Sequence, residues 1–379
     1  MPAAFDERRE AQARAYGRGQ ALLFLLRFGL LFALAAVFWT SGWSRELAAG
    51  LRNWFPHPFA WPLVCAGVAA LATFGYEVAL FPLAVLADFT LERHGGRLHA
   101  EFGAWLRGYV VTLLVETGLM AAAFTGLYML MRLYPVWGWL AATGAYALLV
   151  PGLGEWGPSR LLPRVRPPVP ADDPELEREL RRVGEIAGLE IAGAAWWDFE
   201  HQEDLDDVRL TGWGRRRRAV YSAAAWRGLG RRERVFLAAR HAAWHRRGAA
   251  LGLIALQVAL TGGVFYGAAR LVDWAARARG LSGATAPEAL PFWVVALFGL
   301  AALAGVATNA AARRGELRAD RFALRHAGGR EALEACLRYR FEREPCALDE
   351  PFWQVVLLRK TPTPARRLAQ ARALERGAE

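Results

Sequence analysis

Long apolar runs constrain the fold of this chain more than any other feature of its sequence. A helix crosses the hydrocarbon core of a bilayer with about 20 apolar residues, whereas a surface helix of a soluble protein carries them along one stripe only. The runs here contain few charges: Ala21–Thr40, Phe59–Ala87, Phe102–Leu133, Val136–Leu153, Ala249–Val272 and Leu290–Ala312. We therefore predict an all-α polytopic membrane protein with about six spans, the fourth of them short.

Arginines between the apolar runs predict how the spans are oriented. The chain has a net charge of +11, and its arginines gather in the N-terminal tail, after the second run, and after the fourth and sixth runs. Positively charged loops stay on the cytoplasmic side, so we expect both termini and the large polar insert in the cytoplasm, facing membrane lipid. No cleavable signal peptide is evident, and the first run is interpreted as a retained anchor in the plasma membrane of a prokaryote.

The polar insert is the only sizeable segment outside the membrane besides the two tails. Its apolar spacing predicts helices at Glu175–Leu189 and Arg231–Arg247 and strands at Ile191–Glu200 and Val208–Ser222. A further helical pattern, Asn309–His326, follows the last apolar run. The expected division is a tail with four spans (1–154), a cytoplasmic domain (155–248), two spans (249–312) and a helical tail (313–379).

Two pairs of polar residues are candidates for chemistry. His241 and His245 lie four residues apart, on one face of a predicted helix and close enough to share a metal ion. With only three scattered cysteines, a metal here must rest on histidine and carboxylate. Glu316 and Asp320, also four apart, can supply a third ligand and an acceptor for a ligand histidine. Two simpler interpretations stay open: interfacial histidines, and a charge-paired amphipathic helix.

The order and spacing of these residues resemble the CAAX prenyl endopeptidases, integral-membrane zinc metalloproteases of the gluzincin type. That family places a His-Glu-x-x-His helix just before one span and a Glu-x-x-x-Asp helix just after the next. Here the two histidines precede the fifth apolar run, and Glu316 and Asp320 follow the sixth. The segments Leu210–Arg218 and Phe89–Gly95 also resemble the family's strand before the zinc helix and a loop between early spans.

The resemblance implies a cofactor, a substrate site and a fold for the insert. It implies zinc on His241, His245 and Glu316, with Asp320 orienting a ligand histidine, and a small α+β zincin-like domain. It also implies a strand that holds the substrate, formed by Asp207, Val208, Arg209 and Leu210.

Departures from the family's pattern change the expected activity. Ala242 stands where the family has the glutamate that acts as general base on zinc-bound water. The stretch Thr361–Pro364 lacks the histidine of the family's His-Pro, and Asp207 and Val208 stand in place of its Asn-Ala. Loss of a general base removes about 10²–10⁴-fold in rate. We therefore predict a catalytically impaired or inactive relative that binds zinc and a peptide or lipidated tail.

Other functions remain open at this point. One is an active membrane metalloendopeptidase with an unrecognised base, or an engineered inactive mutant of one. Another is a metal-free membrane scaffold or small-molecule carrier, which zinc content would distinguish. The arginine run Arg215–Arg218 has no interleaved aromatic residues and no nucleic-acid motif, so we expect anionic lipid and not nucleic acid as its partner.

Overall fold

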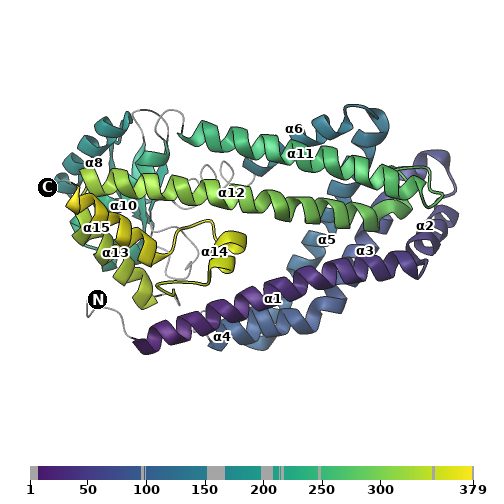
Figure 1. The fold of residues 1–379 in the computed structure, drawn as a ribbon, viewed down its shortest axis with the longest axis horizontal. Helices are drawn as coiled ribbons and strands as arrows, with labels where there is room; N and C mark the ends of the chain where they lie inside the picture. The colour runs from purple at the N-terminus through teal and green to yellow at the C-terminus, as the bar shows by residue number, and fades with distance from the viewer. Residues whose placement is uncertain are drawn as a thin grey trace. The chain divides into compact units, whose positions relative to one another are not determined.

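The computed structural model describes residues 7–94, 98, 100–151, 167–197, 208–212, 214, 217–245, 249–343 and 346–377 (Figure 1). The chain is mainly helical and divides into two compact units. We call the first the membrane unit, Arg18–Ala147 and Val258–Gly305. The second, the polar unit, consists of Met1–Gly17, Leu148–Gln257 and Val306–Glu379.

Long apolar helices confirm the predicted membrane fold. Among the described residues, five helices are long and apolar enough to span a membrane: α1 (Glu7–Thr40), α3 (Trp61–Ala84, with its extension), α5 (Phe102–Leu133), α11 (Ala249–Arg277) and α12 (Leu290–His326). Leu22, Leu251 and Leu303 are exposed on these helices, where lipid chains solvate them better than water does. The fourth expected span forms the shorter apolar helix α6 (Gly138–Pro151).

Helix α3 continues without a break beyond the second apolar run. A π-helical turn, η2 (Val85–Leu91), and the short helix α4 (Glu92–His94) follow it directly. Pro82 lacks an N–H and so disturbs the hydrogen-bond ladder just before the wider turn. The Thr90 hydroxyl donates to the Val85 carbonyl five residues back, at 3.0 Å. The stretch from Phe89, which resembles a loop in the family, is therefore helical up to His94.

Aromatic packing holds the membrane unit together. Helix α3 packs along α5, and Val68, Tyr128 and Trp293 are fully buried. The Tyr128 and Trp293 rings meet edge to face with centroids 6.3 Å apart, and the Trp293 indole N–H donates to the Ala284 carbonyl at 2.8 Å. This donor is thereby satisfied away from water. Shorter elements complete the unit: α2 (Trp43–Trp54), η1 (Pro58–Ala60) and η5 (Pro287–Ala289).

A small mixed sheet organises the polar unit, as the α+β prediction requires. The strands are β1 (Val169–Pro170), β2 (Gly193–Trp197), β3 (Val208–Thr211) and β4 (Arg218–Ser222), in the order β1-β2-β4-β3. The central pair, β2 and β4, is parallel, and both outer pairs are antiparallel. Gly212 and Gly214, between β3 and β4, have positive φ angles of 88° and 55°, which glycine adopts without strain.

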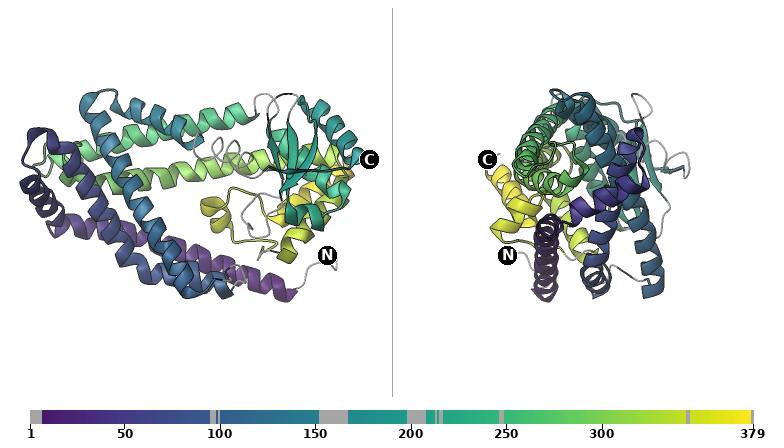
Figure 2. Two further views of the ribbon diagram at one scale, coloured as in Figure 1. Left: turned by 180° about the vertical axis from the view of Figure 1, so that it is seen from behind. Right: turned by 90° about the vertical axis from the view of Figure 1, so that its right-hand side faces the viewer.

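Helices cover this sheet and form the core of the polar unit. The expected helices of the insert are α8 (Pro174–Ala187) and α10 (Arg231–Trp244), which pack against one another and against the sheet (Figure 2). Asp173 caps α8 by accepting from the Leu176 N–H at 3.0 Å. The remaining helices are α9 (Ala223–Gly228), α13 (Gly329–Arg343), α14 (Phe352–Leu358) and α15 (Pro364–Arg376).

Candidate functional site

The predicted substrate strand lies at an edge of the sheet. Val208, Arg209 and Leu210 form β3, which pairs with β4 on one side and is the last strand in the sheet order. Its other side has no strand partner among the described residues, and β3 also packs against α10. Asp207 lies outside the described residues. An open edge of this kind exposes backbone N–H and C=O groups that can pair with an extended peptide.

The two histidines lie at the end of α10. His241 is in the last turn and His245 is the C-terminal cap, with ring centroids 5.7 Å apart. His241 is half-buried and His245 is exposed. The helical spacing therefore brings the two rings close together, as predicted from the sequence.

Ala242 has a very different environment from its histidine neighbour. Its side chain is completely buried in the core that α8, α10 and α13 form. A methyl group there neither accepts a proton nor orients water, and a longer polar side chain would have to displace packed apolar atoms.

The expected metal ligand Glu316 is engaged by a cation of the chain itself. Glu316 and Asp320 lie one turn apart on α12, and Arg240 of α10 forms ion pairs with both. The Arg240 Nε lies 2.6 Å from Asp320 Oδ1. Arg367 of α15 donates Nε and Nη2 to the two Asp320 oxygens at 2.7 and 2.9 Å. We call Arg240, Glu316, Asp320 and Arg367 the ion-pair cluster.

Burial makes the ion-pair cluster an unusual environment for charge. The Asp320 side chain is 0% exposed, and that of Arg367 is 7% exposed. Burial by itself lowers the pKa of the Arg240 guanidinium, but the carboxylates of Asp320 and Glu316 outweigh this effect and raise its pKa. Although burial alone would raise the pKa of the Asp320 carboxyl, Arg240 and Arg367 likewise hold it below its usual value.

The described residues do not fit a zinc ion on His241, His245 and Glu316. No group of three or more His, Cys, Asp and Glu side chains lies close enough to hold a metal in that part of the chain. A metal ion at Glu316 would have to share its carboxylate with the Arg240 cation, which is paired with the Oε2 atom. The Asp320 oxygens serve arginines. Zinc binding at these residues stays a prediction from the family resemblance.

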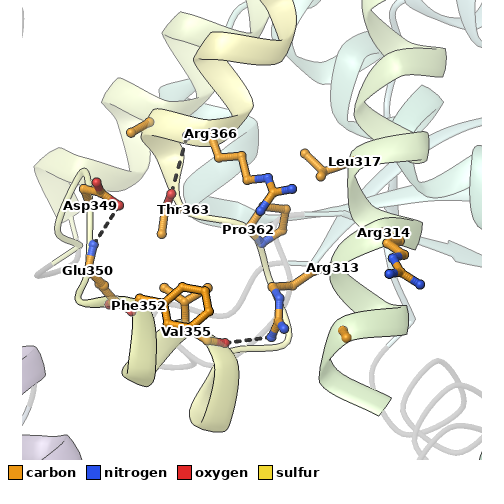
Figure 3. Close-up of a pocket in the computed structure, with 12 residues that line it drawn as sticks. Arg313, Arg314, Leu317, Asp349, Glu350, Phe352, Val355, Pro362, Thr363 and Arg366 are labelled. Carbon is orange, nitrogen blue, oxygen red and sulfur yellow. Dashed lines mark hydrogen bonds between the residues drawn. The ribbon is translucent and has the colours of Figure 1, made fainter. Parts of the chain in front are cut away.

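The C-terminal tail places α15 against the cluster. Thr363 caps α15, its hydroxyl accepting from the Arg366 N–H at 3.4 Å, so Thr361–Pro364 acts as the start of a helix (Figure 3). Nearby, Arg313 donates to the Val355 carbonyl at 2.7 Å and also to that of Arg359. A cavity of about 620 Å³ lies between these elements. The tail is therefore anchored to α12 by arginine side chains.

Sequence reasoning missed Arg240 and Arg367. The chain has many arginines, and no spacing rule separates these two from those that face solvent. Arg240 directly precedes His241, and consecutive residues lie about 100° apart around a helix. For Arg240, its position directly before the histidine pair was the one sequence feature that could have pointed to the site.

A second cavity, of about 810 Å³, lies at the end of α10 in the polar unit. It is lined by Trp244, by the start of α11 and by the stretch of α12 around Gly315. A β-carbon at Gly315 would overlap the Trp244 ring, so only glycine lets these helices pack as they do.

Comparison with known proteins gives a structural match and no sequence match. No protein-family model matches the chain, and no curated protein matches it. A crystal structure of S. mikatae Ste24p superposes with a TM-score of 0.73 at 14% identity, covering 97% of this chain and 90% of that one. Identity this low shows the fold alone. The chain is a polytopic helical membrane protein with the fold of Ste24p.

Proposed function

We propose that this protein binds an extended peptide, or the tail of a lipidated protein, at the membrane without hydrolysing it efficiently. The observation that carries the proposal is the edge of β3 beside α10, which pairs with no strand among the described residues. Ala242 of α10 stands at the general-base position of the motif that the sequence resembles. The motif order resembles that of the CAAX prenyl endopeptidases, and the likeness to Ste24p independently supports a metallopeptidase-like fold.

Peptide binding follows from the chemistry of a sheet edge. A peptide that aligns with β3 gains backbone hydrogen bonds, each contributing about 0.5–1.5 kcal/mol net. The half-buried side chains of Arg209 and Leu210 can then contact the side chains of the peptide. Backbone pairing needs an extended peptide but little particular sequence, so it suits a broad set of tails.

Weak or absent hydrolysis follows from the groups that surround the histidines. Ala242 cannot accept a proton, which removes about 10²–10⁴-fold in rate. The Glu316 carboxylate is paired with Arg240 and is not free to act as a substitute base. A bound peptide would therefore be hydrolysed slowly or not at all.

The proposed location is a prokaryotic plasma membrane, with the polar unit on the cytoplasmic side. The arginine-rich loops support this orientation through the positive-inside rule. Lipidated tails reach such a site from the membrane surface, where their acyl chains are already inserted.

The full chain in lipid nanodiscs tests the proposal directly. The probes are a fluorescent eight-residue peptide and the same peptide with a C-terminal farnesylated cysteine. We expect anisotropy to report binding, and N-methylation of alternate peptide amides to weaken it about fivefold for each backbone hydrogen bond lost, because each bond contributes about 1 kcal/mol. Mass spectrometry should show intact peptide after prolonged incubation.

Two outcomes would contradict the proposal. Cleavage that His241→Ala abolishes would identify an active metalloendopeptidase. Binding that is insensitive to N-methylation, or no binding, would exclude the edge of β3 as the site. The second result would favour a metal-free scaffold, which the pairing of Arg240 with Glu316 also supports.

A further inference from the structure

We propose that Arg240 takes the place of a metal ion in this chain, its guanidinium being the cation that joins α10 to α12. The side chain that meets Glu316 is an arginine, whereas the resemblance to zinc peptidases implies a metal ion there. The proposal rests on the ion-pair cluster and is independent of the proposed peptide binding.

The geometry of the cluster suits one cation shared by two carboxylates. Glu316 and Asp320 lie four residues apart on one face of α12, so both carboxylates reach the same guanidinium from α10. Arginine has five N–H donors in a rigid planar fork, so one side chain serves two acids at once. A bound metal ion would join the same two helices through its ligands.

The charges of the cluster balance without a metal. Two carboxylates, on Glu316 and Asp320, face two guanidiniums, on Arg240 and Arg367, so the formal sum is zero. Adding Zn²⁺ at Glu316, whose side chain is only 18% exposed, would leave a charge of +2 in the cluster, and poorly solvated unpaired charge is unfavourable. Zinc and Arg240 therefore compete for Glu316.

Arg367 extends the same connection to the C-terminal tail. Its two bonds to Asp320 hold α15 against α12, while Arg240 holds α10. The cluster thus links three helices that are far apart in the sequence. Breaking it at Arg240 should loosen the polar unit as a whole, which is what removal of a structural metal does in a metalloprotein.

The wild-type chain provides the first test. Protein purified in detergent without chelator is measured for zinc, and its thermal midpoint is recorded with and without EDTA and with added Zn²⁺. We expect less than about 0.2 zinc per chain and a midpoint that neither reagent shifts. One zinc per chain, with a midpoint that falls in EDTA, would overturn the proposal.

Substitution of Arg240 provides the second test. Arg240→Leu keeps much of the side-chain volume and removes the cation, so we expect the thermal midpoint to fall by about 5 °C or more. It also releases Glu316, and Zn²⁺ should now bind and restore part of the loss. Arg232→Leu is the matched control, because Arg232 lies on the same helix in an exposed pair with Glu331.

A double substitution separates the metal effect from general damage. Arg240→Leu with Glu316→Gln removes both charges of the pair, so the response to zinc should disappear while the midpoint rises above that of Arg240→Leu alone. Equal effects of Arg240→Leu and Arg232→Leu would contradict the proposal. If Arg240→Leu does not fold, the wild-type zinc and EDTA measurements decide it alone.

Discussion

The histidine pair and the carboxylate pair are two halves of one expected metal site, and their environments differ sharply. Both have the four-residue spacing of a helix face. The histidines lie at the end of α10, where His245 is exposed, whereas Asp320 on α12 is fully buried and bound by arginines. The comparison teaches that spacing places ligands on a face, while the neighbouring elements decide whether their lone pairs are available.

The largest expected effect on stability comes from the carboxylate pair, at the buried Asp320. Asp320→Ala leaves Arg240 and Arg367 without their shared anion, and an uncompensated buried charge costs about 3–5 kcal/mol. We expect a large fall in the thermal midpoint of unfolding, measured by tryptophan fluorescence. Glu331→Ala removes an exposed carboxylate and is the control, with at most about 1 kcal/mol expected. Equal effects of the two would show that the cluster contributes no more than a surface pair.

The next largest effect is expected at Ala242, which follows the first histidine of the pair. Ala242→Glu introduces the glutamate that the CAAX prenyl endopeptidases have after the first histidine, but it places a carboxylate in a fully buried position, so we expect a loss of about 2–4 kcal/mol in stability. We also expect no peptide cleavage by mass spectrometry, because Arg240 still holds Glu316. Ala242→Gln is the control of equal size. Cleavage by the glutamate variant alone would show that the site lacks only its base.

A smaller effect concerns the packing of α10 against α12. Gly315→Ala places a methyl group on the Trp244 ring and should cost about 1–3 kcal/mol in the thermal assay. Gly305→Ala on the same helix has open space around the new methyl and should be neutral or slightly stabilising. Combining Gly315→Ala with Trp244→Leu should recover part of the loss. No recovery would mean that the ring is not the cause.

The smallest effect on stability is expected from the histidine pair, at the exposed His245. His245→Ala removes a ring that faces solvent at the end of α10, so stability should change by less than about 0.5 kcal/mol. Zinc content should not change either, if Arg240 serves as the cation. A fall in midpoint comparable with that of Asp320→Ala would reverse the comparison and make the histidines a structural centre.

Much of the fold was predictable because a membrane helix can be identified from one continuous apolar stretch of sequence. An apolar run such as Ala249–Val272 can only be solvated by lipid, and its helix follows from the need to satisfy every backbone group internally. In the insert, the spacing of Leu176, Leu180 and Val183 similarly predicted α8, where all three are fully buried. The short fourth helix, α6, was also expected, whereas the helical continuation of α3 to His94 was not evident, because it depends on where a helix ends.

The candidate site was predictable only in part. The sequence by itself determined the membrane-spanning character, the mixed insert, and the proximity of His241 to His245, because each depends on residues close together in the chain. The tertiary structure alone decided which cation faces Glu316, since Arg240, Asp320 and Arg367 come from three separate helices. Contacts between distant segments are set by packing, and packing brought an arginine where the spacing predicted a metal.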